Sequence, residues 1–219
     1  MKTRVMQDSE INVFKEKYPD LLSQIPMILR AVENIVKLFK NKGILYICGN
    51  GGSYADAIHI KGELGKSFIC KRKILGASAR QIAHQPAGPA LSRDLEIGFP
   101  VIVLGESHSL RTAFSNDVDP MFIYAQELLS FVHFIRPGLL LGISTSGNAK
   151  NVLHAISVAK AYRVQTLGLT GPDGGMLSKV SDIIIKVPGK DTAAIQENHL
   201  PVYHLICKLV EVNFFKNLK

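Results

Sequence analysis

Short apolar runs alternate with stretches of helical spacing along most of this chain, and this alternation limits the folds that it can adopt. Five runs are rich in Ile, Leu and Val and cover residues 44–49, 100–104, 139–143, 164–170 and 182–187. A run without polar alternation is typical of a strand that is buried on both faces, as in a parallel sheet. The sequence therefore predicts an α/β fold in which a five-stranded parallel sheet is flanked by helices, doubly wound with right-handed crossovers.

The segments between these runs carry apolar residues at three- and four-residue steps, which predicts helices. Long N-terminal helices fill residues 1–43, where Pro19 and Pro26 divide the pattern in two and Gly43 is suited to a left-handed cap. Further helices are expected from the end of the Asn-Gly-Gly-Ser segment to about residue 67, and over residues 109–115, 119–132, 147–162 and 192–216. A short helix is also expected after Gly-Pro-Asp-Gly-Gly.

Residues 70–99 break this rhythm with scattered glycines and prolines and no clean period. We interpret them as an inserted surface excursion that holds one short helix. The length of 219 residues and the content of 47% hydrophobic and 20% charged residues are typical of a globular chain. We expect one domain over residues 1–219, large enough to bury a core without staples.

The net charge of +8, from 26 basic and 18 acidic residues, points to an anionic partner. The basic residues are dispersed, however, and the densest run is only Lys71–Lys73. No helix–turn–helix, zinc-finger or RNA-binding aromatic motif is present, so nucleic acid is not the expected partner. A small phosphorylated metabolite explains the charge as well.

The three cysteines (Cys48, Cys70 and Cys207) form neither a disulfide framework nor a zinc-ribbon spacing. No apolar run approaches the roughly 18 residues of a membrane span, and the first ten residues lack the apolar stretch of a signal peptide. We therefore expect a cytoplasmic protein with reduced, buried thiols and no membrane partner.

Two loops share one design, because each is rich in glycine or hydroxyl groups and lies between a predicted strand and a helix. The first spans residues 48–53 (Cys-Gly-Asn-Gly-Gly-Ser) and the second spans 143–148 (Ile-Ser-Thr-Ser-Gly-Asn). At the carboxyl end of a parallel strand, such loops offer backbone N–H groups, hydroxyl groups and a helix N-terminus to an anion. The alternative is a pair of ordinary tight turns with serine caps. Neither loop has Rossmann or Walker spacing.

Polar residues on two predicted helices form the third constellation. His59 and Glu63 are four residues apart and share a helix face, and Gln196 and His204 are eight apart on the last helix, which Pro201 interrupts. A His/Glu pair four residues apart is a common arrangement of metal ligands, but taken alone it is more often a solvated surface pair. A carboxylate and an imidazole near an anion loop also suit proton transfer between a sugar carbon and its oxygen.

Four segments together are similar to the sugar-isomerase (SIS) domain family, in its phosphoheptose isomerase branch: GNGGSYADAIHIKGEL, LLLGISTSGNAKNVLHAISVAK, LGLTGPDGG and IQENHLPVYH. The resemblance covers the whole chain except residues 70–99. It implies a flavodoxin-like parallel sheet and a homotetramer whose active sites lie between subunits. It also implies an enzyme that isomerises sedoheptulose 7-phosphate to D-glycero-D-manno-heptose 7-phosphate through an enediol.

The resemblance also implies roles for individual residues. Catalytic acid–base roles fall on Glu63 and His204, and the ligands of one zinc ion per subunit are His59, Glu63, Gln196 and His204. Substrate and phosphate binding falls on Asn50, Gly51, Gly52, Ser53, Asn116, Asp117, Ser144, Thr145, Ser146 and Gln196.

The chain departs from the family pattern at several positions. Ala149 replaces a serine after the second loop, Ala193 replaces an aspartate, and Lys66 is the best candidate for a shifted basic residue. The 70–99 excursion is also longer than the corresponding segment of the family. Its basic residues are Arg72, Arg80, His84 and Arg93. They either contact a substrate or a neighbouring subunit, or they lie on a solvated loop. Two alternatives therefore stay open, namely an isomerase of another sugar phosphate, or a non-catalytic sugar-phosphate-binding regulator of replication or transcription.

Overall fold

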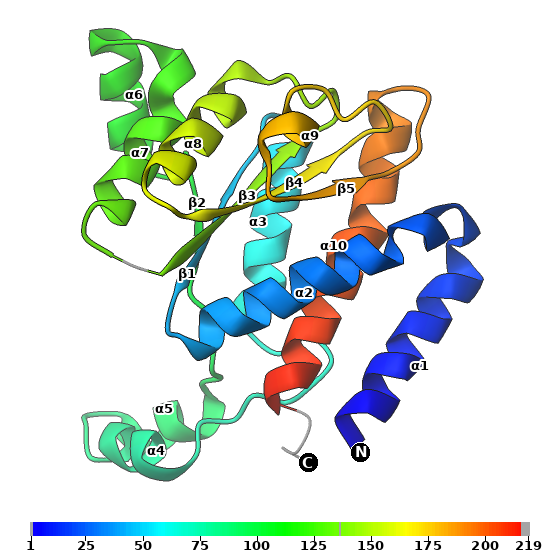
Figure 1. Cartoon of the computed structure of the whole chain (residues 1–219). Helices are drawn as coiled ribbons and strands as arrows, with labels where there is room; N and C mark the ends of the chain where they lie inside the picture. The colour runs from blue at the N-terminus through cyan, green and yellow to red at the C-terminus, as the bar shows by residue number, and fades with distance from the viewer. Residues whose placement is uncertain (1, 136, 216–219) are drawn as a thin grey trace.

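The five predicted strands are present and form one parallel sheet (Figure 1). They are β1 (Ile44–Cys48), β2 (Val101–Val103), β3 (Gly138–Ser144), β4 (Gln165–Thr170) and β5 (Ile183–Lys186). The strand order is β2-β1-β3-β4-β5 and every pairing is parallel, which confirms the predicted fold class. The computed structural model describes residues 2–135 and 137–215.

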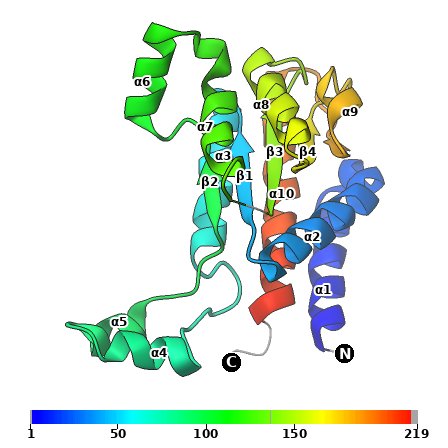
Figure 2. The same cartoon turned by 60° about the vertical axis from the view of Figure 1, so that its left-hand side comes forward.

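The sheet buries both of its faces because successive side chains of each strand point to opposite sides. Leu45 and Ile47 belong to a core with α2 (Ile25–Lys40), α3 (Gly52–Gly65) and α10 (Thr192–Phe215). Tyr46 and Cys48 belong to a second core with α7 (Ile123–Val132), α8 (Lys150–Ala161) and α9 (Leu177–Val180). Helices therefore cover both faces, as Figure 2 shows.

The N-terminal segment divides at its prolines, as predicted. α1 (Lys2–Lys17) is followed by the short 3-10 helix η1 (Pro19–Gln24), and Pro26 lies in the first turn of α2. α1 lies within the predicted range and packs along α10 (Figure 1). Within the described residues, no helix combines the length and the apolar character that crossing a membrane requires.

The remaining helices agree closely with the prediction. α6 (His108–Asp117), η2 (Pro120–Phe122) and α7 fill the expected 109–115 and 119–132 segments. α10 continues through Pro201 as one helix to Phe215, and residue 216 of the predicted helix lies outside the described residues. Most of the apolar side chains in the second half of α10 are buried in this chain's own core.

The 70–99 excursion contains two helices where we expected one. They are α4 (Gly76–Ala83) and α5 (Gly88–Asp94), which pack on each other and project from the sheet (Figures 1 and 2). A Cβ at Gly88 would lie 2.3 Å from the carbonyl oxygen of Ile82, so only glycine allows this close approach. Neither helix covers a core, and this explains why no apolar period marked them.

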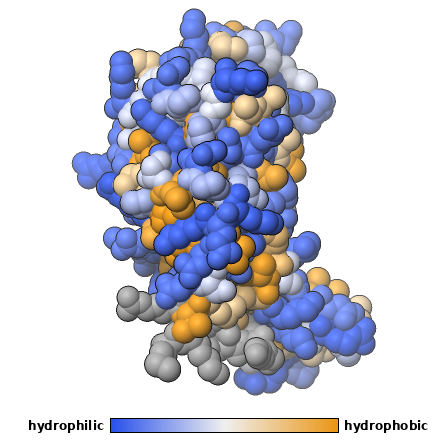
Figure 3. Space-filling view, turned by 90° about the vertical axis from the view of Figure 1, so that its right-hand side faces the viewer, coloured by the Kyte–Doolittle hydropathy of each residue, from blue (hydrophilic) through white to orange (hydrophobic). Residues whose placement is uncertain are grey.

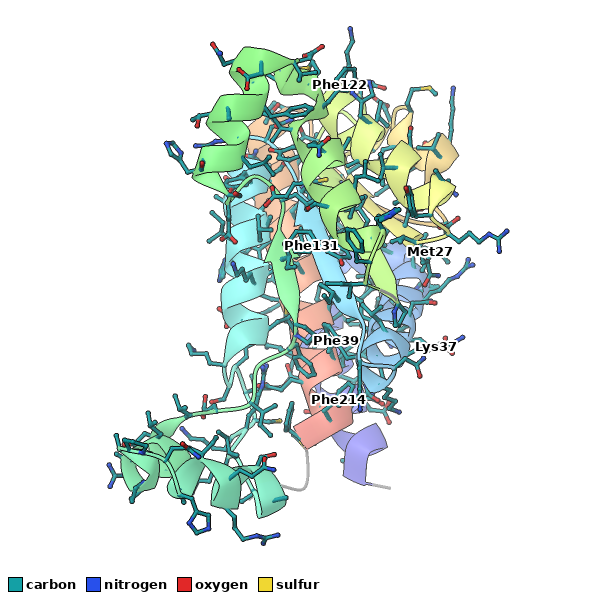
Figure 4. The ribbon with its side chains drawn as sticks, turned by 90° about the vertical axis from the view of Figure 1, so that its left-hand side faces the viewer. Met27, Lys37, Phe39, Phe122, Phe131 and Phe214 are labelled. Carbon is teal, nitrogen blue, oxygen red and sulfur yellow. The ribbon has the colours of Figure 1, made fainter. Side chains whose placement is uncertain are left out.

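Arg72 corrects the interpretation of the excursion's basic residues as substrate contacts or solvated charges. Its side chain is fully buried, and its Nε donates to Oε1 of Glu211 at 2.6 Å. Glu211 also accepts the backbone N–H groups of residues 68, 69 and 70. The Arg72 guanidinium lies over the ring of Phe99, which stacks on Phe39 at 4.6 Å; Figure 4 shows Phe39 and Phe214 in this region. The pair anchors the excursion to α10.

Candidate active site

The two small-residue loops meet at the carboxyl ends of adjacent strands. β1 and β3 pair side by side, and the direction of winding reverses between them, which is where ligands bind in open α/β sheets. The loops enclose a cavity of about 360 Å³. Its walls are Asn50, Gly51, Gly52, Ser53, Ile143, Ser144, Thr145, Ser146, Ala149, Thr192 and Gln196.

The chemistry of this cavity suits an anion. It opens at the first turns of α3 and α8, and neither turn is capped by a side chain. Ser53 and Ser144 are nearly buried, whereas Thr145 and Ser146 reach the solvent. Gly51 has a φ of +55°, a conformation that glycine adopts without strain. Backbone donors, hydroxyl groups and two positive helix ends therefore converge on one space.

Ala149, noted above as a departure from the family pattern, belongs to this cavity. It is the residue that precedes α8 and it lines the cavity, so a serine at this position would add a hydroxyl to the wall. Thr192, which sequence reasoning did not single out, lines the same cavity from the start of α10.

Asn50 is held by neighbours that the sequence reasoning missed. Its side-chain amide exchanges two hydrogen bonds of 2.8 Å with Asn151 of α8, and its Oδ1 accepts from the Tyr124 hydroxyl at 3.1 Å. Burial raises the pKa of Tyr124 above its ordinary value, so this phenol stays a donor. A second hollow of about 370 Å³ shares Asn50 and Gly51 with the anion cavity and reaches Arg111. The two hollows therefore adjoin at Asn50 and Gly51.

His59, Glu63 and His204 come together where α3 packs against α10. The Nε2 atom of His59 lies 3.0 Å from Oε1 of Glu63 and 3.4 Å from Nε2 of His204. One possible ligand atom from each side chain falls within 4.8 Å of the others. Burial and the nearby His59 lower the pKa of His204, so its imidazole is neutral near pH 7. The four-residue spacing thus marks a real cluster.

This cluster fits a divalent metal. Two imidazole nitrogens and one carboxylate oxygen are a donor set that zinc accepts, and three protein ligands leave a position open for water or substrate. Tetrahedral bonds of about 2.1 Å separate neighbouring ligand atoms by roughly 3.4 Å. The contacts of 3.0 Å and 3.4 Å within the cluster are close to this spacing.

Gln196 lies with the anion cavity. A Cβ at Gly52 would be 2.4 Å from its Nε2, so the amide rests directly on the first loop. Gln196 is eight residues before His204, which corresponds to about 12 Å of helix rise. Its substrate-binding role agrees with this placement, and its role as a metal ligand stays a prediction.

Asn116 and Asp117 lie apart from these groups. Both are exposed at the end of α6, where the Asn116 amide donates to Asp117 at 2.9 Å. Neither belongs to the walls of the two hollows described above. Lys66 is also exposed and donates to the carbonyl of Ser67. The roles expected for these three residues stay predictions.

Comparisons with known proteins agree with this geometry. The model of the SIS domain family matches residues 14–97. The chain is 34% identical to the phosphoheptose isomerase of Helicobacter hepaticus over 204 residues, which are 93% of this chain and 91% of that protein. Among solved structures, a phosphoheptose isomerase from Francisella tularensis aligns with a TM-score of 0.71 and 26% identity, covering 95% of this chain and 96% of the other. The enzyme from Neisseria gonorrhoeae gives a TM-score of 0.69 and 25% identity, covering 96% and 97%. The chain therefore belongs to the phosphoheptose isomerase family and is an isomerase built on the SIS fold.

Proposed function

We propose that this isomerase converts sedoheptulose 7-phosphate to D-glycero-D-manno-heptose 7-phosphate. The observation that carries the proposal is that α3 links both parts of the site. The anion cavity lies at its first turn, and His59 follows Ser53 by six residues, or about 9 Å of helix rise. This span is comparable to the extended chain of a seven-carbon sugar phosphate. A phosphate in the cavity would thus bring the other end of the sugar to the cluster.

The binding step uses the two loops. Ser53, Ser144, Thr145 and Ser146 offer hydroxyl groups to the phosphate, while the first turns of α3 and α8 add their positive field. Phosphate binding far from the reacting carbons supplies energy that orients C1 and C2. Gln196 and Asn50 line these hollows and would contact sugar hydroxyls beyond the phosphate.

The chemical step is proton transfer by Glu63 and His204. One of them removes a proton from C1 of the ketose while the other protonates O2, which gives the enediol. The enediol then loses the O1 proton and gains a proton at C2, which yields the aldose with no net change in atoms. The neutral His204 imidazole beside Glu63 is able to take or return a proton in either half of this cycle.

One zinc ion per subunit is part of the proposal. His59, Glu63 and His204 would hold it, with Gln196 as a further ligand, and the metal would supply polarisation of the carbonyl oxygen. The donor set of the cluster supports the first three of these ligands.

The proposed assembly is a homotetramer with active sites between subunits, located in the cytoplasm. Apolar side chains exposed along α1 and α2 support association: Val5, Met6, Val13 and Leu29. Figure 3 shows apolar patches among charged residues on the face where these helices lie. The three free, buried thiols are consistent with a reducing compartment. Light scattering at micromolar concentration should give the mass of four chains, and a monomer would contradict the proposal.

The activity is tested by NMR with sedoheptulose 7-phosphate on metal-stripped protein, with and without added zinc. We expect the manno-heptose phosphate to appear, and to appear faster with zinc. Binding of the ketose without turnover would instead support a regulator, and turnover of a different ketose phosphate would redefine the substrate. Turnover that does not depend on zinc would contradict only the catalytic role of the metal and would leave the proposed isomerisation intact.

A further inference from the structure

The hollow that adjoins the anion cavity at Asn50 and Gly51 contains a positive charge that the proposed reaction does not use. Arg111 of α6 lines it, so we call it the Arg111 hollow, and its other walls come from α3, η2, α7, α8 and the loops after β1 and β2. Figure 4 shows η2, marked by Phe122, at the same end of the molecule as α6. The volume of about 370 Å³ falls within the range of ligand pockets, about 300–1,000 Å³.

The charge of Arg111 is not neutralised by a carboxylate. None of the ion pairs in the described part of the chain includes Arg111, and its Nη2 atom lies instead 3.0 Å from Nδ1 of His108. Two carboxylates of neighbouring elements have other partners. Glu106 pairs with Lys61, and Glu127 accepts a backbone N–H group of the loop after β2. A guanidinium stays protonated at physiological pH, so the hollow keeps a positive charge without an acidic partner.

The asparagine pair adds hydrogen-bond donors to this charge. The backbone N–H of Val152 donates to Oδ1 of Asn151 at 3.0 Å, which fixes the orientation of that amide. Asn50 donates to the same oxygen, and its own Oδ1 accepts from Asn151 and from the Tyr124 hydroxyl. Both amide oxygens are therefore occupied. Each Nδ2 atom carries two N–H groups, and one of them in each residue has no acceptor within the described structure.

This inventory decides which chemical group fits the hollow. A sugar hydroxyl donates one hydrogen bond as well as accepting, whereas an oxyanion only accepts. Burial and the charge of Glu106 raise the pKa of Tyr54, so its hydroxyl in the wall stays protonated and adds a further donor. Arg111 supplies a charge-assisted donor, and the apolar side chains of Met121 and Ile123 strengthen such contacts by excluding water. The hollow therefore favours a phosphate or a carboxylate.

We propose that the Arg111 hollow is a second oxyanion subsite, so that a sugar phosphate with a second anionic group spans both hollows and competes with the singly phosphorylated substrate. The hollows adjoin at Asn50 and Gly51, which allows one ligand to occupy both. Sedoheptulose 7-phosphate has one phosphate, which the anion cavity takes. The inference rests on the anion cavity of the proposed function and not on the identity of the sugar.

The first test measures binding by calorimetry and needs no turnover. The probes are fructose 1,6-bisphosphate and 6-phosphogluconate, with fructose 6-phosphate as the singly anionic reference. We expect a doubly anionic probe to bind the wild type about 10- to 100-fold more tightly than the reference, and Arg111→Gln to remove this advantage. A gain with the bisphosphate alone would identify the second group as a phosphate, and a gain with 6-phosphogluconate alone would identify it as a carboxylate.

The matched control is Arg30→Gln, because Arg30 is exposed on α2 and lines neither hollow. It should bind every probe like the wild type, and the reference should bind all three proteins equally. The proposal would be overturned if neither doubly anionic probe bound more tightly than the reference, or if the advantage persisted in Arg111→Gln.

The second test is inhibition of sedoheptulose 7-phosphate turnover by the tighter probe. Inhibition should be competitive, and Arg111→Gln should raise the inhibition constant about 10- to 100-fold while KM and kcat keep their wild-type values. A rise in KM as large as the rise in the inhibition constant would contradict a second subsite, because Arg111 would then contact the substrate itself. Binding that depends on Arg111, in a wild type that does not convert sedoheptulose 7-phosphate, would uphold the inference and contradict the proposed substrate.

Discussion

Arg72→Met should be one of the most destabilising single substitutions in this chain. Arg72 and Glu211 are both fully buried, so neither charge is compensated by water once the other is removed. The substitution deletes the bond to Glu211 at 2.6 Å and leaves two backbone carbonyls, of residues 64 and 63, without this donor. Breaking a buried pair from one side typically costs about 3–5 kcal/mol.

The middle of that range is the expected value here. Glu211 keeps the three backbone N–H groups of residues 68–70, which lowers the cost of leaving it ionised. The carbonyl of residue 64 keeps the backbone N–H of Phe99, so the loss falls on the carbonyl of Glu63, and an unsatisfied buried acceptor costs roughly 1–3 kcal/mol. We therefore expect Arg72→Met to lower the free energy of unfolding by about 4 kcal/mol.

Urea unfolding followed by circular dichroism, at one protein concentration, measures this loss through the shift in midpoint. The matched control is Arg93→Met, because Arg93 pairs with Asp94 on the exposed surface of the excursion. The control should unfold like the wild type. A loss below about 1 kcal/mol in Arg72→Met would refute the reasoning, since a value that small is typical of surface ion pairs.

Two further predictions follow from close contacts and burial. Gly52→Ala should raise KM for the sugar phosphate, because its Cβ would lie 2.4 Å from Nε2 of Gln196; steady-state kinetics should show no such change in Gly62→Ala, whose Cβ meets nothing within 4 Å. Burial raises the pKa of Cys48 to about 12 and also raises that of Cys207, so both thiols stay protonated at pH 8. Mass spectrometry after iodoacetamide treatment should find both unmodified until the protein is unfolded, and rapid modification of the native protein would contradict their burial.

The elements that cover the sheet were predictable from sequence, and those that do not cover it were less so. The five strands are apolar at almost every position because helices bury both faces, and this produced an unmistakable pattern. α4 and α5 pack on each other and bury no large apolar side chain, so they lack the strong periodic pattern of the helices that cover the sheet.

In the candidate site, too, contacts between residues far apart in the sequence were not predictable from local patterns. The spacing of His59 and Glu63 indicated a shared helix face, and only the family resemblance joined His204 to them; the structure brings the three side chains together. Arg72 and Glu211 are 139 residues apart, so no local sequence pattern predicts that they pair. Tyr203 was hidden for a different reason. It directly precedes His204 and reads as one more apolar residue of α10, and only the packing of α3 brings its hydroxyl to His59.

The most direct test of the proposed function is proton NMR of sedoheptulose 7-phosphate in deuterium oxide, with the wild-type chain and with Glu63→Gln. The wild type should convert the ketose and incorporate deuterium at C2 of the aldose, because the enediol exchanges protons through Glu63 and His204. Glu63→Gln should keep the fold and lose both conversion and exchange. Conversion by Glu63→Gln at the wild-type rate would contradict the assignment of proton transfer to the cluster between α3 and α10.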